Sequence, residues 1–332
     1  MARKDFVRVL REVAKRNHLD FRAMSHDWVI QIVDPAAAGR ICNVFGYTFD
    51  INGAGAAEVC KEKAATSLVL GSHGVANVEH RVFLNPSNEF TAPYVPPEGN
   101  YTSMRALIET EFGGLPVVLK PLKGSGGLDV IRAASWKDVE AAVQLIFGRE
   151  YGVAVSKFYD IRDEYRCVCL DDKVYVAYRK HRQRVVGDGE RNVASLAARH
   201  IESAAPKDRP ALYRALSEIS ADKLDYVPGA EEQVLLQWKH NLGQGATASI
   251  LDRATEGPLV DALQVLALSA VQAVGMRFCS VDIIDVKGEG LMVMEINSGV
   301  MMDALITQLG DDGAALAYDV YESAVLRALA RK

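Results

Sequence analysis

A glycine-rich segment between two apolar runs constrains this chain more than any other feature of its sequence. It follows the run at residues 117–120, precedes a second run at residues 128–131, and consists of Gly124, Ser125, Gly126 and Gly127. Glycine lets a backbone approach a phosphate group closely and direct several N–H groups at it. Lys120, at the end of the first run, adds a positive charge. The segment predicts a phosphate-covering turn between two strands, with a flexible hairpin carrying surface lysines as the alternative.

The position of this turn excludes two common phosphate-binding motifs. Its spacing differs from the G-x-x-x-x-G-K-[ST] pattern of a P-loop. It also lies between two strands, whereas the glycine fingerprint of a dinucleotide-binding fold opens a helix. The turn therefore indicates neither a P-loop nor a dinucleotide-binding fold.

Polar side chains that suit a metal ion lie on two apolar segments near the C-terminus. Asp282 lies on the first segment, and Glu295 and Asn297 lie on the second, after a glycine-containing turn at residues 287–290. Side chains two residues apart on a strand share a face, so Glu295 and Asn297 can meet Asp282 on a paired strand. Carboxylate and amide oxygens suit Mg²⁺, which often shares phosphate oxygens with a nucleotide. Strand-end acids facing solvent are the alternative, which the alternation with apolar residues disfavours.

The overall composition is that of a soluble globular chain. The chain has 332 residues, of which 49% are apolar and 24% charged, and this length allows about two domains. The net charge of -5 gives no electrostatic reason to bind nucleic acid or an anionic membrane. The longest apolar stretch, residues 259–276, is interrupted by polar side chains and predicts a buried helix instead of a membrane span. The scattered, odd set of five cysteines and the lack of a secretion signal favour a reduced cytoplasmic protein.

The histidines lack a second histidine at the spacing of metal ligands. We expect each to be structural or at the surface, and we assign none as a base. The four concerned are His73, His80, His181 and His240. Cys167 and Cys169 share one strand face without a partner pair, which favours packing over metal binding.

Several segments occur in an order that resembles a known superfamily. They are Lys63-Ala-Ala-Thr66, residues 74–84, Lys120-Pro121 with the glycine-rich turn, residues 153–159, Glu164-Tyr-Arg166, Arg179-Lys180, Val186-Gly-Asp-Gly189 and Asn241-Leu-Gly-Gln-Gly245-Ala-Thr247. Together with the acidic cluster they resemble the ATP-grasp superfamily. The resemblance is to its carboxylate–amine ligases, related to the ribosomal S6 modification enzyme, cyanophycin synthetase and the ATP-grasp part of bifunctional glutathione synthetase. It covers about residues 50–330.

The resemblance implies an α+β (α/β) chain with the ATP-grasp fold, in which two α+β subdomains grip ATP. We expect a short N-terminal β-containing extension at residues 1–55. A central subdomain with the glycine-rich phosphate loop would follow at residues 56–155, and a C-terminal subdomain with the metal site at residues 156–332. The region before Lys63 is shorter than the usual preceding domain, so substrate contacts normally made there would be reduced or come from another subunit.

The resemblance also implies roles for individual residues. The nucleotide would be bound by Lys63, Lys120, Gly124, Ser125, Gly126, Gly127, Ser156, Lys157, Phe158 and Glu164. The metal ligands would be Asp282, Glu295 and Asn297. The reacting phosphate or carboxylate would be contacted by Lys120, Arg166, Arg179 and Asn241. The family commonly has a glutamate where Ser156 stands, which leaves adenine recognition to backbone groups and Lys157.

The implied function is that of an ATP-dependent carboxylate–amine ligase. A substrate carboxylate attacks the γ-phosphate of ATP, an amine attacks the resulting acyl phosphate, and ADP and phosphate are released. The implied cofactors are ATP and two Mg²⁺ ions, with Mn²⁺ as an alternative. The expected substrate is an amino acid or a peptide, with no nucleic acid or membrane partner, and a homodimer is an open alternative to a monomer. A peptide-modifying enzyme of a natural-product pathway and a non-catalytic ATP-binding regulator are the alternative functions.

Overall fold

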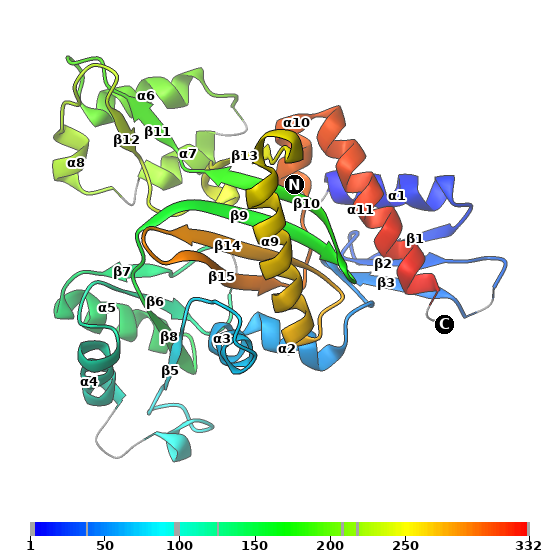
Figure 1. The fold of residues 1–332 in the computed structure, drawn as a ribbon, viewed down its shortest axis with the longest axis horizontal. Coiled ribbons are helices and arrows are strands. Elements are labelled where there is room, and N and C mark those ends of the chain that lie inside the picture. The colour runs from blue at the N-terminus through cyan, green and yellow to red at the C-terminus, as the bar shows by residue number, and fades with distance from the viewer. Residues whose placement is uncertain are drawn as a thin grey trace.

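Five antiparallel strands form the largest sheet of the protein, in the order β13-β10-β9-β14-β15 (Figure 1). The computed structural model describes residues 4–37, 39–95, 100–124, 126–206, 209–216 and 219–330, so Ser125 lies outside the described residues. The strands are β9 (Ile161–Leu170), β10 (Lys173–His181), β13 (Thr247–Ile250), β14 (Phe278–Val286) and β15 (Gly290–Asn297). The hairpin predicted after Asp282 is confirmed: β14 and β15 pair across a short turn.

Helix α9 (Arg253–Val274) covers one face of this sheet. Its buried side chains are Leu263, Ala267, Ala270, Val271 and Val274, and they pack against apolar side chains of β9, β14 and β15. The helix is long and apolar enough to cross a membrane by length and composition, a test that the core helix of a soluble protein also passes. Its packing on the sheet confirms the expected core helix.

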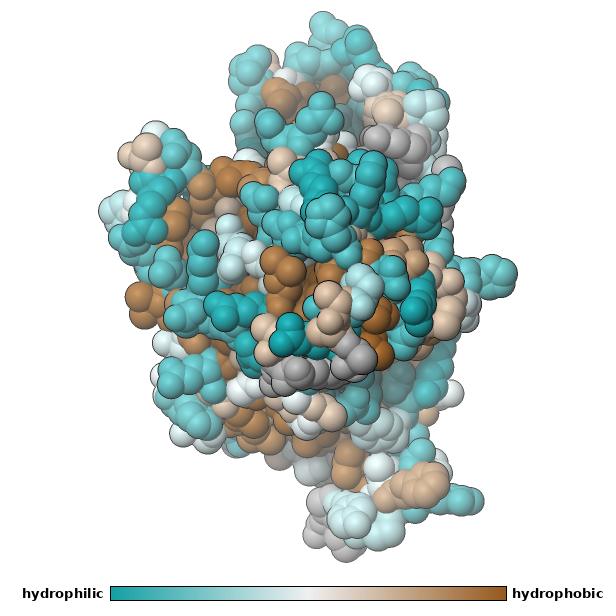
Figure 2. All heavy atoms as spheres, turned by 90° about the vertical axis from the view of Figure 1, so that its right-hand side faces the viewer, coloured by the Kyte–Doolittle hydropathy of each residue, from teal (hydrophilic) through white to brown (hydrophobic). Residues whose placement is uncertain are grey.

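The N-terminal segment packs against the opposite face of the sheet and against the last helix. It comprises α1 (Lys4–Arg16) and a four-stranded sheet of β1 (Asp20–Met24), β2 (Val29–Val33), β3 (Ile41–Phe45) and β4 (Thr48–Phe49). Helices α10 (Asp303–Leu309) and α11 (Asp311–Leu329) complete this end. Its core includes edge-to-face contacts of Phe6 with Tyr321 and of Phe49 with Phe278. Figure 2 looks onto this end, where hydrophobic side chains reach the surface among hydrophilic ones.

A second mixed layer consists of a four-stranded antiparallel sheet and two helices. The strands, in the order β5-β8-β6-β7, are β5 (Arg81–Leu84), β8 (Gly152–Lys157), β6 (Val117–Pro121) and β7 (Ile131–Ala133). Helices α4 (Asn100–Glu111) and α5 (Trp136–Phe147) lie beside this sheet. Ser135 and Asp138 form a capping box at the start of α5. The other face of the sheet carries Lys120.

Residues 54–72 form two helices, α2 (Ala54–Lys61) and α3 (Lys63–Ser72). They break at Glu62, because its extended backbone and its carboxylate, which accepts bonds from two backbone N–H groups, form the N-cap of α3. Both helices contact α9 and β15 of the large sheet. This contact places Lys63, the first residue of α3, near β15.

A small lobe follows β10 and lies at the upper left of Figure 1. It contains β11 (Arg184–Val186), β12 (Gln233–Leu235), α6 (Val193–Ser203), α7 (Arg209–Leu216) and α8 (Ala221–Asp225). Two short 3₁₀ helices, η1 (Ala92–Tyr94) and η2 (Leu242–Gln244), lie in connections elsewhere. The chain returns from the lobe through Trp238, Lys239 and Asn241, which lie beside the glycine-rich turn.

Candidate active site

The face of the large sheet that points away from α9 carries four charged side chains at one end. They are Glu164, Arg166, Lys180 and Asp282. Arg166 lies opposite Asp282, and Glu164 lies opposite Lys180, in the strand register. The intervening residues pack on α9 and include Tyr165, Cys167, Val281 and Ile283. Alternation along the strands therefore gathers the charges on one face.

Asp282 is the centre of a buried ion network. The Arg166 guanidinium donates to both carboxylate oxygens of Asp282, at 2.5 and 2.6 Å. The Lys180 ammonium lies 3.0 Å from Asp282 Oδ1 and also donates to Glu164. Burial alone would raise the pKa of Asp282, but the two cations outweigh it and hold this pKa well below its usual range. Burial raises the pKa of Glu164, against the effect of Lys180.

Glu295 and Asn297 extend this polar face onto β15. Glu295 lies directly opposite Asp282, so the expected meeting of these residues on paired strands is confirmed, and Asn297 lies opposite Ser280. The Asn297 side-chain amide donates to Glu295 Oε1 at 3.0 Å. A register shift after Asp282 adds one residue to β15, so the alternation of side chains between the two faces is interrupted at Met294. It resumes with Glu295, which lies on the same face as Asp282. The structure thus brings the three expected metal ligands to one place.

These three residues fit a hard cation unequally. Across the described part of the chain, no group of three or more His, Cys, Asp or Glu residues is arranged to hold a metal ion. Both oxygens of Asp282 accept bonds from Arg166, whereas among the described residues no cation donates to the Asn297 amide oxygen or to the second Glu295 oxygen. Oxygen donors of this kind suit Mg²⁺. Glu295 and Asn297 could therefore hold a cation directly, whereas both oxygens of Asp282 are engaged by Arg166.

Two lysines form the opposite wall of this site. Lys63 Nζ donates to the carbonyl of Gly124 at 3.3 Å, and Lys120 Nζ lies 3.2 Å from the imidazole of His80. Burial lowers the pKa of both lysines, in Lys120 to about 8, and the carboxylate of Glu295 acts in the opposite direction on each. Residues 76–78 bond to the backbone of Val293, which ties this wall to β15. Positive and negative walls thus face each other.

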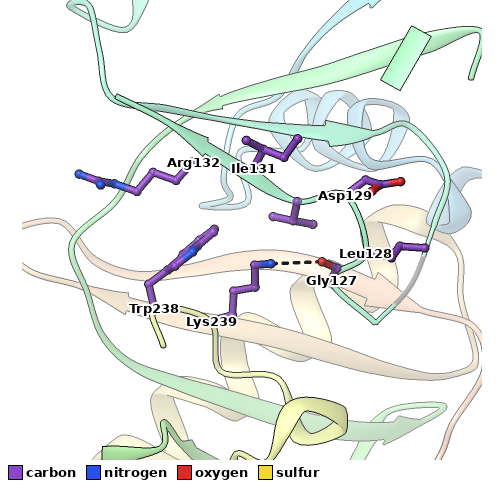
Figure 3. Close-up of a pocket in the computed structure, with 8 residues that line it drawn as sticks. Gly127, Leu128, Asp129, Ile131, Arg132, Trp238 and Lys239 are labelled. Atoms are coloured by element: carbon purple, nitrogen blue, oxygen red, sulfur yellow. Dashed lines mark hydrogen bonds between the residues drawn. The ribbon is translucent and has the colours of Figure 1, made fainter. Parts of the chain in front are cut away.

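The glycine-rich turn lies beside this site, where Lys63 contacts Gly124, and it differs from the expected strand. The second strand begins at Ile131 instead of residue 128, because Gly126, Gly127 and Asp129 all have positive φ, which a strand does not accommodate. The Asn241 side-chain amide donates to the carbonyl of Gly126 at 2.5 Å. Lys239 donates to the carbonyl of Gly127 at 3.4 Å (Figure 3). A Cβ on Gly127 would stand 3.2 Å from the Asn241 amide nitrogen, so this close approach favours glycine.

A cavity of about 530 Å³ adjoins the turn. Its lining consists of residues 127–132, Trp238 and Lys239, which Figure 3 shows around a common space. The Phe158 ring lies near Trp238, with centroids 5.9 Å apart, and beneath the Arg132 guanidinium at 4.6 Å. Aromatic and cationic groups of this kind can stack on a heterocyclic base.

The other expected hinge residues differ in exposure. Ser156 is buried on β8, opposite Val118 of β6. Lys157 is exposed, and its ammonium lies 3.3 Å from the Glu289 carboxylate. Only Phe158 of the three contacts the aromatic residue that lines the cavity.

The structure does not bring Arg179 together with this group. Its guanidinium points to the α9 side of the sheet and donates to Glu256 at 2.8 Å, and it lies 3.7 Å from Asp163. The next residue, Lys180, enters the site instead. The sequence signal for Lys180 is its alternation with buried Val176 and Tyr178. Adjacent residues of a strand point to opposite faces, so Arg179 and Lys180 cannot both face the site. His80 also lies at the site, and no spacing rule indicated it.

Comparisons with known proteins agree with this architecture. No family model matches the sequence. A protein of Vibrio atlanticus named "Probable alpha-L-glutamate ligase" is 23% identical over 212 residues, which are 63% of this chain and 51% of that protein. A cyanophycin synthetase of Nostoc is 28% identical over 186 residues, 52% of this chain and 20% of that protein. The chain thus spans about half or less of the length of these relatives.

A solved structure extends the likeness over nearly the whole chain. The bifunctional glutathione synthetase of Pasteurella multocida superposes with a TM-score of 0.53 at 18% identity, covering 95% of this chain and 43% of that one. This likeness confirms the fold expected from the sequence. The chain therefore has the ATP-grasp fold and is related to glutamate ligases and cyanophycin synthetases of that fold.

Proposed function

We propose that this chain is an ATP-dependent carboxylate–amine ligase that forms an amide through an acyl phosphate. The observation that carries the proposal is the pair of facing walls. Lys63, Lys120 and the glycine-rich turn offer positive charge and backbone N–H groups on one side. Glu295 and Asn297 offer oxygen ligands on the other. A nucleotide triphosphate with its divalent cation is the ligand that satisfies both walls.

Each part of the site has a role in this proposal. Lys63 and Lys120 hold the phosphates, and the turn at residues 124–127 covers them. The base lies near Phe158 and Trp238, close to Ser156 and Lys157, and Glu164 lies on the ribose side. Arg166 and Asn241 orient the reacting groups. Arg179 pairs with Glu256 on the α9 side of the sheet, and Lys180 takes its place at the site.

The metal in this proposal is Mg²⁺, as two ions, with Mn²⁺ as an alternative. Glu295 and Asn297 hold it, and Asp282 joins them when its ion pairs open. When bound, the metal neutralises charge on the phosphates. The chain's own cations contribute as well. Lys120 lies on the wall opposite these ligands and adds positive charge from that side.

The proposed reaction needs positioning more than covalent catalysis. A carboxylate oxygen of the substrate attacks the γ-phosphorus, the bond from that phosphorus to the β–γ bridging oxygen breaks, and ADP leaves. An amine then attacks the acyl carbon, phosphate leaves, and the amine proton passes to solvent. The turn, clamped by Asn241 and Lys239, would keep water from the acyl phosphate.

The substrate class is an amino acid or a peptide. The names of the two relatives support this class, since one is a glutamate ligase and the other a cyanophycin synthetase. A modified peptide of a natural-product pathway is the alternative product. A cytoplasmic location and a homodimer remain predictions, which cell fractionation and light scattering would test.

ADP formation is expected to depend on both a carboxylate substrate and an amine. The test incubates the protein with ATP, Mg²⁺ and pairwise mixtures of amino acids and short peptides, and mass spectrometry identifies the nucleotide and the amide. Hydroxylamine, as a small surrogate amine, should raise turnover and give a hydroxamate. ATP binding without ADP release across the panel would favour the regulator. AMP with pyrophosphate would refute attack at the γ-phosphate.

ATP affinity is expected to fall as the pH rises through about 8. The Lys120 pKa is lowered to about 8 by burial, so above that pH its ammonium loses the charge that attracts phosphate. Lys120→Arg should bind ATP with nearly constant affinity from about pH 7 to about pH 9, because a guanidinium stays charged throughout. Calorimetric titration of both proteins with ATP checks this. An affinity of the parent that does not change over this range would contradict the role of Lys120.

A further inference from the structure

His80 is a buried histidine that directly contacts one of the two site lysines. Its exposed fraction is 2%, and its Nε2 lies 3.2 Å from Lys120 Nζ. It precedes β5, which pairs with β8, and β8 in turn pairs with β6, the strand of Lys120. Ala154 of β8 lies between Val82 and Lys120 in the register, and its small side chain leaves room for the lysine to reach across this strand.

The chemistry of the two groups fixes the direction of their hydrogen bond. An ammonium group only donates, so His80 Nε2 must accept. His80 is therefore neutral, with its proton on Nδ1. Burial and the nearby Lys120 ammonium lower the pKa of His80 well below its usual value, in agreement with this state. The bond leaves two of the three Lys120 N–H groups for other acceptors.

The backbone of His80 is anchored to the helix that begins with Lys63. The His80 N–H donates to Ser67 Oγ at 3.1 Å, and the Ser67 hydroxyl donates to Asn77 Oδ1 at 2.9 Å. Ser67 lies on α3, one turn after Lys63. The same short segment also bonds to β15 through Val78. The backbone that carries the imidazole is thus tied to α3 on one side and to β15 on the other.

We propose that His80 is a positioning residue that holds the Lys120 ammonium in the direction of the nucleotide phosphates. This inference rests on the proposed function, because it takes ATP as the ligand of Lys120. A lysine side chain is flexible and pays conformational entropy when it is fixed. A rigid acceptor inside the protein fixes it before the nucleotide arrives. In this role His80 neither takes up nor releases a proton. It acts through Lys120.

Two substitutions separate positioning from packing. His80→Leu removes the acceptor and should weaken ATP binding about tenfold, the usual effect of losing a hydrogen bond to a charged group. His80→Gln places an amide oxygen near the position of Nε2 and should restore most of the affinity. Calorimetric titration with ATP measures both, and thermal melting shows that both variants fold. His73→Leu is the matched control, because His73 lies in the same segment but is exposed, and its affinity should equal that of the parent.

A double-mutant cycle tests whether His80 acts through Lys120. In a Lys120→Met background, His80→Leu should cause no further loss of ATP affinity. An equal loss in both backgrounds, or full affinity of a folded His80→Leu protein, would overturn the proposal. So would a His80→Gln protein as weak as His80→Leu.

The nitrogen chemical shifts of His80 test the contact without any nucleotide. Nuclear magnetic resonance of the parent protein should show a neutral ring with the proton on Nδ1 at about pH 6, where a free histidine is largely protonated. A proton on Nε2, or a cationic ring, would overturn the inference while leaving the ligase proposal intact. The expected ring state in a parent protein that binds no ATP would instead refute the proposed function, and the positioning role with it.

Discussion

Replacement of Asp282 by alanine is expected to destabilise the protein by about 3 to 5 kcal/mol. The substitution leaves the Arg166 guanidinium and the Lys180 ammonium without the carboxylate that both contact. The Lys180 side chain is only 4% exposed, so water cannot replace the lost partner. Glu164 keeps its own bond to Lys180. Urea unfolding of the two proteins, followed by circular dichroism, measures the difference in the free energy of unfolding.

Asp261→Ala is the matched control for this prediction. Asp261 also pairs with an arginine, Arg253, but the pair is exposed, with 59% of the Asp261 side chain accessible. Exposed pairs of this kind contribute under about 1 kcal/mol. Equal losses of stability in the two variants would contradict the large contribution expected of the buried Asp282 network.

The pH dependence of stability has a definite sign. The folded pKa of Asp282 lies below that of an unfolded aspartate, so its contribution is present above the unfolded value and is lost as the pH falls towards the folded one. The difference in free energy of unfolding between the parent and Asp282→Asn should therefore shrink as the pH falls.

Local rules were sufficient to predict the pairing of the acidic residues. A short glycine-containing turn and period-2 alternation predicted that Asp282, Glu295 and Asn297 meet on paired strands, and the structure places Glu295 opposite Asp282. The capping box at Ser135 is equally local. The place of Lys63 at the turn followed only from the resemblance, because 61 residues separate it from Gly124 along the chain.

The ion pairs of the site could not be predicted in the same way. The choice between Arg179 and Lys180 depends on which face of β10 is covered by α9, a tertiary contact. Whether Asp282 faces a cation of the protein or an open space depends on β9 and β10 together. His80 has no spacing signal of its own, and the strand order β5-β8-β6 brings it to Lys120. Such contacts arise from packing over long sequence separations, which periodicity does not report.

Glu295→Gln is expected to keep the fold and lower Mg²⁺-dependent turnover by more than about a hundredfold. Glutamine is nearly isosteric, and its amide oxygen can still accept the bond that Asn297 donates. The substitution removes the negative charge that faces Lys63 and Lys120, and with it the accessible anionic ligand for the cation. Binding of ATP without metal should change little, because the lysines and the turn remain. Titration of ADP release with Mg²⁺, at saturating ATP, separates these two effects.

Asp285→Asn is the control that distinguishes a metal ligand from a general change in charge. Asp285 lies on β14, three residues after Asp282, and pairs with Arg162 at 3.5 Å instead of facing the lysines. This variant loses the same unit of charge from the same sheet but keeps the proposed metal ligands. It should therefore require the same Mg²⁺ concentration as the parent. Long-range electrostatics alone would shift both variants to a similar extent. A Glu295→Gln protein with the Mg²⁺ dependence and turnover of the parent would remove Glu295 from the metal site, and the facing-wall arrangement would then hold phosphate without a cation on β15.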